Sequence, residues 1–277
     1  MTTLKNPMEI FKLLPRTDCR DCGAATCLAF SVLVFKGEKR LADCPHLDSA
    51  LAQNAHVTGL KAANADETLA AGIAALKKKV PALDFAQAAP RLGATVAGDR
   101  LAIRCLGKNF QIDSQGNIHT DIHVNNWLLM PLLDYVLNAK GAEPAGQWVP
   151  FVELAGGREL NPLFMQRCEI PIKEVADRDS DLFFDLLGLF SGRELTDGFH
   201  ADRSVVLYPL PKVPMVVAYS FAEEGFESTL RLLFDRQVEE NLHAESLRTL
   251  ATGVARMIRR LVRRHGFPES FMKHVNR

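Results

Sequence analysis

Four cysteines gathered in one short stretch constrain the fold of this chain more than any other sequence feature. They are four of the six cysteines among 277 residues, and their spacing is Cys19-x2-Cys22-x4-Cys27-x16-Cys44. A segment of about 50 residues buries too little apolar surface to be stable alone, so it needs a metal or another cross-link. Cytosolic thiols are kept reduced, and clustered cysteines there indicate metal or redox chemistry before disulfides.

The cysteine spacing predicts an iron–sulfur cluster of the [4Fe-4S] type. Four thiolates satisfy such a cubane, one for each iron. Three thiolates packed into nine residues would wrap one face of it, and the fourth would return after a helix. Zinc is the alternative, but zinc sites usually take two Cys-x2-Cys pairs, and the sequence has one. The predicted ligands are Cys19, Cys22, Cys27 and Cys44.

The residues around these cysteines are expected to favour a negatively charged cluster. A short helix is predicted over residues 27–35, closed by Gly37, and the N–H groups of its first turn would point at the cluster. Arg16 and Arg20 would add positive charge beside the loop. Gly23 would let backbone amides approach the sulfurs closely.

The rest of the chain has blocks of helices and blocks of strands, which predicts an α+β fold rather than a doubly wound one. Alanine-rich residues 48–80 predict a connecting helix, and alternating residues 92–120 predict an antiparallel meander. The other expected elements are helices over 7–14 and 127–137, a strand and turn over 148–157, a helix-rich stretch to 190, strands on either side of Pro211 and Pro214, a strand over 230–234 and a helix over 244–264. Three parts follow: a small helical cluster module at 1–48, a helical linker at 49–84, and a larger domain of antiparallel sheet and helices at 85–277.

At the cysteines the sequence resembles a known module. The segment DCRDCGAATCLAFSVLVFKGEKRLADCP, preceded by IFKLLPRT, is similar to the four-cysteine module of the corrinoid iron–sulfur protein large subunit and of the RnfB subunit of the Rnf electron-transport complex. The resemblance covers residues 5–48 and implies one [4Fe-4S] cluster on the same four cysteines. Beyond it, GQWVPFVELAGG, YPLPKVPMVVAYSF and LLFDRQVEENLHAESL resemble the family called domain of unknown function 3786, over residues 85–265. The barrel and corrinoid-binding parts of the corrinoid protein find no match, so corrinoid binding is not implied.

Charge is balanced overall but uneven along the chain. The 33 basic and 33 acidic residues exclude a globally basic nucleic-acid-binding protein. Residues 143–245 carry 19 acidic and nine basic side chains, whereas residues 246–277 carry eight basic and one acidic. Helical spacing predicts one basic stripe made of Arg256, Arg259, Arg260, Arg263 and Arg264. The stripe could bind an acidic redox partner, cofactor phosphates or a membrane surface, or be merely solvated. Nucleic acid is not expected, because aromatic residues do not accompany it.

Three further features have both a structural and a functional interpretation. His119, Asp121 and His123 would share one strand face and could bind a divalent metal, although an exposed polar edge is favoured. Cys105 and Cys168 are expected to pack in the core. An acidic run is expected to form the solvated face and start of a helix, with catalytic use as the alternative: Glu174, Asp177, Asp179, Asp181 and Asp185.

These features together predict a cytoplasmic electron-transfer protein, in which a cubane exchanges single electrons and the larger domain binds the redox partner protein. By resemblance alone, that partner is a low-potential or corrinoid-linked protein of anaerobic metabolism. One alternative is an oxidoreductase with a substrate or cofactor between the domains, and another is a binding module that iron–sulfur or zinc only holds together. The cytoplasm is expected because we find no secretory signal and no apolar run near the ~20 residues of a membrane span.

Overall fold

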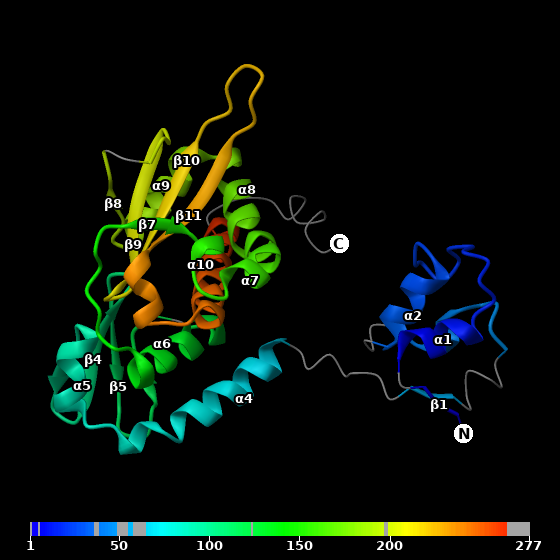
Figure 1. Ribbon diagram of the computed structural model, residues 1–277, viewed down its shortest axis with the longest axis horizontal. Coiled ribbons are helices and arrows are strands. Elements are labelled where there is room, and N and C mark those ends of the chain that lie inside the picture. Colours follow the sequence, from blue (N-terminus) through cyan, green and yellow to red (C-terminus); the bar gives the residue numbers. More distant parts are fainter. Residues whose placement is uncertain are drawn as a thin grey trace. The chain divides into compact units, whose positions relative to one another are not determined.

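The computed structural model describes residues 2–4, 6–35, 39–48, 55–57, 65–122, 124–196 and 199–264. The chain forms two units, Met1–Thr68 and Leu69–Arg277, called the small unit and the larger unit below (Figure 1). The boundary between the two units falls inside one helix, α4 (Ala65–Lys77).

Two short helices pack against each other in the small unit. The first helix begins at Pro7 because the Asn6 side chain caps it, accepting a hydrogen bond from the Glu9 N–H at 2.9 Å. Two strands pair in parallel beside these helices. The elements are β1 (Thr2–Leu4), α1 (Pro7–Leu13), α2 (Cys27–Phe35), a 3-10 turn (Leu41–Asp43) and β2 (Ala55–Val57).

A five-stranded antiparallel sheet forms the centre of the larger unit, in the order β7-β11-β10-β9-β8. Strands β9 and β10 form a hairpin, as the sequence predicts. One face of β10 joins the main core through Val217, while the other face packs Val216 in a separate small cluster, so nearly every residue of β10 is buried. The strands are β7 (Trp148–Pro150), β8 (Arg193–Glu194), β9 (Arg203–Leu210), β10 (Val213–Ser220) and β11 (Thr229–Asp235).

The predicted meander is a second antiparallel sheet with the order β3-β4-β5-β6. Its β4–β5 turn needs Gly107, whose φ is +74°, in the left-handed region that favours glycine. Just before that glycine, the Leu106 N–H donates to the Tyr208 carbonyl at 2.9 Å and ties this sheet to β9. The strands are β3 (Thr95–Ala97), β4 (Arg100–Cys105), β5 (Lys108–Ile112) and β6 (Ile118–His119).

Helices complete the core of the larger unit, and the last of them, α10, packs along α6. Close approach of these two helices requires Gly253, because an added Cβ there would lie 2.9 Å from Cδ2 of Leu128. Figure 1 shows α7, α8 and α10 grouped beside the five-stranded sheet. The helices after α4 are α5 (Phe85–Leu92), α6 (Asn126–Asn138), α7 (Gly157–Phe164), α8 (Ile170–Arg178), α9 (Ser180–Leu189) and α10 (Ala244–Arg264). Shorter turns occur at Val80–Ala82, Phe151–Glu153, Met165–Glu169 and Arg236–Glu240.

The observed elements confirm the α+β fold. The strand and turn expected over residues 148–157 are confirmed: the strand ends at Pro150, which has no N–H to continue the ladder, and a 3-10 turn follows. Gly37, the expected end of the helix over 27–35, lies outside the described residues. Within the described ranges, every helix is too short or too polar to cross a bilayer.

Candidate metal centre

The small unit holds all four cysteines of the predicted centre. Cys19 and Cys22 lie in the loop between α1 and α2, Cys27 is the first residue of α2, and Cys44 directly follows the 3-10 turn. Cys27 and Cys44 are each 6% exposed, Cys22 is half-buried, and Cys19 is exposed. Cys27, Cys44 and Cys22 belong to one apolar core. The candidate centre therefore has a buried side and a side open to solvent.

The loop that carries the first two cysteines has an unusual backbone. Arg16, Asp18 and Arg20 have φ values of 57°, 48° and 68°, in the left-handed region that costs L residues of order 1 kcal/mol each. Gly23 follows at φ +73°, and its N–H donates to the Arg20 carbonyl at 2.7 Å. Such strain persists only where the surroundings impose it, and it clusters at functional sites. The backbone of this loop therefore adopts a conformation that its residues would not favour by themselves, in the segment that carries two of the cysteines.

The N-terminus of α2 differs from the expectation that its N–H groups point at a cluster. The Cys27 N–H donates to Oδ1 of Asp18 at 2.6 Å, and the Ala29 N–H donates to Oγ1 of Thr26 at 3.0 Å. These side chains cap the helix, so two of its first three N–H groups are already satisfied. Asp18 thereby connects the loop that carries Cys19 and Cys22 to α2, whose first residue is Cys27.

The positive charge beside the loop also comes from a different residue than expected. The Arg16 guanidinium lies over the Phe11 ring, 5.4 Å from its centroid, and Arg20 is exposed. Lys39, from beyond α2, reaches back instead: its Nζ donates to the Cys22 carbonyl at 2.5 Å. The cation that fixes the ligand loop is therefore Lys39, which sequence reasoning missed because it is 17 residues away in the chain.

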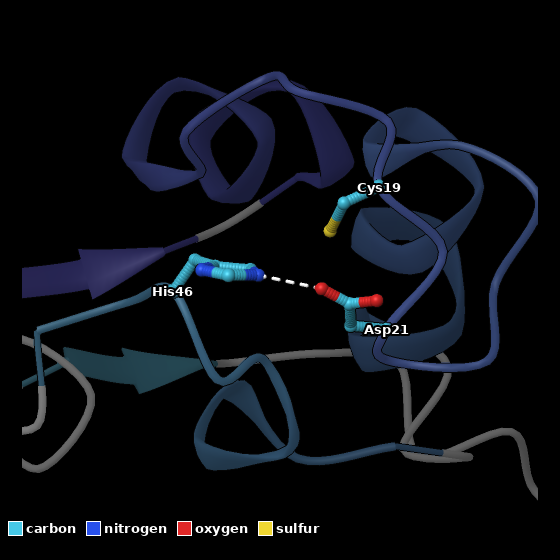
Figure 2. Close-up of side chains that lie close together, drawn as sticks. All are labelled: Cys19, Asp21 and His46. Carbon is cyan, nitrogen blue, oxygen red and sulfur yellow. Dashed lines mark hydrogen bonds and ion pairs between the residues drawn. The ribbon is translucent and has the colours of Figure 1, made fainter.

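A hydrogen bond between two side chains joins the ligand loop to the turn after Cys44. His46 Nε2 donates to Oδ2 of Asp21 at 2.7 Å, and the Cys19 sulfur lies within 4.8 Å of both groups (Figure 2). The bond from His46, together with one from the Cys19 thiol, lowers the pKa of Asp21. Because a metal-bound thiolate has no proton to donate, Asp21 would then keep His46 as its partner. Neither residue stood out in the sequence.

The residues present fit an iron–sulfur cluster. All four thiols are free and belong to one small unit, and the loop and the turn that carry them are joined by the Asp21 to His46 hydrogen bond. The apolar side formed with Cys27 and Cys44 would exclude water from part of the cluster, and exposure is one of the factors that set cluster potential. Four cysteines are the usual ligand set for a cubane and also suit zinc.

Comparison with known families covers both units. Residues 84–257 match a family model described as "Domain of unknown function (DUF3786)", which is more than half of the chain. The chain belongs to the DUF3786 family. Residues 14–46 of this DUF3786 protein match a second model, described as "Putative Fe-S cluster", and these residues include all four cysteines. The chain therefore carries an iron–sulfur cluster segment ahead of its DUF3786 domain.

Curated relatives match the cluster segment alone. The DUF3786 protein is 41% identical over 44 residues to the acetyl-CoA decarbonylase/synthase complex subunit gamma of Methanosarcina acetivorans, covering 16% of this chain and 9% of that one. It is 42% identical over 43 residues to the corrinoid/iron-sulfur protein large subunit of Moorella thermoacetica, covering 16% and 10%. The chain thus spans about a tenth of the length of these relatives. No solved structure matches it.

Within the DUF3786 domain, His119 and Asp121 do not share the single strand face that the metal-binding alternative would need. Strand β6 ends at His119, so Asp121 does not continue the same strand face. His119 Nε2 instead lies 3.0 Å from Oδ2 of Asp113 and lowers the pKa of that carboxyl group. His123 lies outside the described residues.

The two cysteines of the DUF3786 domain are core residues, as predicted. Cys105 is 6% exposed and Cys168 is fully buried. Burial raises the pKa of both thiols, to about 12 for Cys168. Both cysteines belong to the main core of the larger unit, whereas the four predicted ligands belong to the small unit.

One member of the acidic run is more than a solvated side chain. Asp177 accepts hydrogen bonds from the Tyr219 hydroxyl at 2.9 Å, from Ser228 Oγ at 2.6 Å and from Lys173 Nζ at 2.6 Å. It joins α8 to β10 and to the segment before β11. Burial alone would raise the pKa of Asp177, but these three hydrogen bonds outweigh it and lower the pKa. Asp179 caps α9, as expected at a helix start, by accepting from the Leu182 N–H.

The predicted arginine stripe is divided in the structure. The Arg256 guanidinium lies 4.2 Å from the centroid of the Trp127 ring, and Arg259 is half-buried, which lowers its pKa. The side chain of Arg264 lies outside the described residues. Arg260 and Arg263 are exposed, as is the part of Arg256 that does not face the ring. The four arginines whose side chains are described therefore differ in their surroundings and do not form one uniform solvated surface.

Proposed function

We propose that this chain is a single-electron carrier whose [4Fe-4S] cluster is held by Cys19, Cys22, Cys27 and Cys44. The observation that supports it best is the uneven burial of these ligands: two are buried in the apolar core of the small unit and one is exposed. A cubane bound there would supply reversible uptake and release of one electron. The donor set fits both a cubane and zinc, and the matched cluster segment favours iron.

The side chains around the centre have distinct parts in this proposal. Cys27 and Cys44 hold the inner side in an apolar environment, and the open side at Cys19 lets a redox partner approach. Lys39 binds the Cys22 carbonyl and adds positive charge near the sulfurs, which stabilises the more reduced, more negative state. Asp21 acts in the opposite sense, because a carboxylate beside Cys19 disfavours an additional electron.

The proposal includes the domain division 1–48, 49–84 and 85–277, with the DUF3786 domain binding the partner protein. The DUF3786 match begins at residue 84, and the two units divide at Thr68, inside the proposed linker. We also assign the chain to the cytoplasm, because all six cysteines are free thiols.

The proposed partner is a low-potential or corrinoid-linked redox protein. Relatives that share the cluster segment are named as subunits of an acetyl-CoA decarbonylase/synthase complex and of a corrinoid/iron-sulfur protein. The partner would make its electron-exchanging contact at the small unit, near the exposed Cys19. The arginine stripe is a weaker candidate for that contact, because Arg256 packs on an aromatic ring and Arg259 is half-buried.

Electron counting tests this function. The anaerobically purified full chain is reduced with dithionite, freed of excess reductant, and titrated with a one-electron oxidant. We expect one electron per chain, lost in Cys27→Ser and retained in Cys105→Ser, whose residue lies in the larger unit. A chain that returns no electrons, or that contains stoichiometric zinc, would favour the alternative in which the metal only holds a binding module together.

A further inference from the structure

A pocket of about 500 Å³ opens in the larger unit, and its lining residues all belong to that unit. Its walls come from the segment before α6, the end of α9 and the partly exposed flank of α10. Five of its lining residues are apolar: Ile122, Leu189, Phe190, Met257 and Leu261. Leu189 is 56% exposed, which is unfavourable for a leucine unless something covers it. The volume lies in the range of small-molecule sites, 300–1,000 Å³.

Three cations complete the lining: Lys108, Arg256 and Arg260. Among the described residues that line the pocket, Asn125 is the remaining polar one, and none is a carboxylate. This positive charge stands out because residues 143–245, which include α9, carry a large excess of acidic side chains. An apolar cavity bordered by cations is complementary to a molecule with an apolar body and an anionic group.

Two neighbouring hollows extend the positive surface. One shares Lys108 with the pocket and the other shares Phe190, and both include Arg104. The second also includes Arg193. Within the described residues of these linings, the single carboxylate is that of Asp121, on the first hollow. The cationic character is therefore a property of the whole region.

Two of the cations, Arg256 and Lys108, are positioned by contacts within the fold. Arg256 makes a cation–π contact with Trp127, with 4.2 Å between the guanidinium carbon and the ring centroid. Lys108 follows a turn in which Leu106 has a φ of +49°, and Ser191, at φ +57°, packs against Gly107. An added Cβ on Gly107 would lie 1.9 Å from Ser191 Oγ. Leu106, in this turn, and Ser191, which packs against it, thus both have left-handed backbone although neither is glycine. Backbone strain of this kind clusters at ligand sites.

We propose that this pocket binds a small organic anion with an apolar body, its carboxylate or phosphate held by Lys108, Arg256 and Arg260. The apolar walls would take the body of the ligand, and the cations would fix its head. An inorganic anion would leave the exposed side of Leu189 in water, and a neutral apolar molecule would not interact with the charges of Lys108 and Arg260. The site is independent of the cluster and adds a ligand to the DUF3786 domain.

Fluorescence titration of the full chain with 8-anilinonaphthalene-1-sulfonate tests the proposal, because this probe is an aromatic anion of the proposed class. We expect one saturable site that weakens as salt rises. Arg260→Glu and Lys108→Glu should each weaken binding roughly ten- to hundredfold. Arg263→Glu is the matched control: it makes the same charge change at an exposed position of the same helix, outside the pocket lining, and should leave binding nearly unchanged. Circular dichroism verifies that each variant is folded.

Competition then identifies the head group. Decanoate and decyl phosphate should displace the probe, and the stronger of the two distinguishes a carboxylate ligand from a phosphate ligand. Decyltrimethylammonium and inorganic phosphate should not displace it. If Arg263→Glu weakened probe binding as much as Arg260→Glu does, the probe would be attracted by the overall charge of the helix, and the proposal would be overturned. Unchanged binding in both pocket variants, or displacement by the cationic detergent, would overturn it as well.

Discussion

The small unit and the larger unit bury apolar side chains on very different scales. Among the described residues, the core of the small unit has nine buried side chains, and two of them are Cys27 and Cys44. The main core of the larger unit has 49, drawn from both sheets and from the helices that cover them. A core of nine cannot offset the conformational entropy of its chain, so what the cysteines bind decides whether the small unit folds.

Removing the metal centre should have the largest effect, and it should fall on one unit. Oxidative iron removal in the presence of a chelator should abolish hydrogen-exchange protection in α2, because the four ligands no longer close its core. Protection in α10 should stay as it was, because Leu250 and Val254 pack in the independent core of the larger unit. Peptide-level exchange of the full chain before and after iron removal measures both. Equal loss of hydrogen-exchange protection in α2 and α10 would contradict the view that only the small unit depends on the metal centre.

Serine substitution at one cysteine of each unit should separate metal binding from packing. Cys44→Ser should lose the iron, because it removes a proposed ligand. Cys168→Ser should keep it and destabilise the larger unit by roughly 1–3 kcal/mol, since a hydroxyl replaces a buried thiol 3.4 Å from Oγ1 of Thr252. Iron content and urea unfolding of each variant check this. Iron loss in Cys168→Ser would mean that the larger unit supports the centre directly.

Helix caps allow the same comparison with a smaller change. Asp18→Ala removes one of the two side-chain hydrogen bonds that cap α2, and Asp179→Ala removes the cap of α9; each should cost about 0.5–2 kcal/mol. We expect Asp18→Ala to retain less iron, because Asp18 joins the ligand loop to Cys27. Asp179→Ala should change the unfolding midpoint alone. If both variants keep their full iron content, the loop is held without its cap.

The smallest predicted effect is the contribution of Asp177 to the pH dependence of stability in the larger unit. The pKa of Asp177 is lower in the folded chain than its value of about 3.9 in an unfolded one. Its contribution to stability is therefore present above about pH 4 and is lost as the pH falls through the folded pKa. The side chain is 34% exposed, so solvent screening keeps the contribution below about 1 kcal/mol.

Asp177→Asn provides the measurement. The difference in urea midpoint between the natural chain and this variant should be present at pH 6 and should shrink toward pH 3. A difference that is constant or grows on acidification would show that the hydrogen bonds from Tyr219 and Ser228 do not depend on the charge of Asp177.

Sequence patterns predicted the parts of this molecule that depend on neighbours in the chain. The α2 bounds followed from the apolar run after Cys27, and the meander followed from alternation broken by glycine turns. The hydrogen bond between Asp21 and His46 spans 25 residues, and the contact of Ser228 with Asp177 spans 51. Neither follows from local spacing, because only folding brings these partners together.

The arginine stripe also shows that local spacing does not reveal contacts with distant parts of the chain. Helical spacing correctly predicted a helix, but it treated the five arginines as equivalent. Their differences arise from what α10 packs against: Trp127, far away in the sequence, takes Arg256, and the apolar pocket beside α9 adjoins Arg260. The pocket itself combines four separate segments, so periodicity within one segment gives no signal of it.

Chemical analysis of the anaerobically purified chain tests the central claim most directly. Iron, acid-labile sulfide and zinc are measured on the same sample, and electron paramagnetic resonance spectra are recorded before and after dithionite. The account predicts about four irons and four sulfides per chain, with a signal that appears on reduction. Stoichiometric zinc without iron, or iron that gives no signal in either state and takes up no electron, would contradict it.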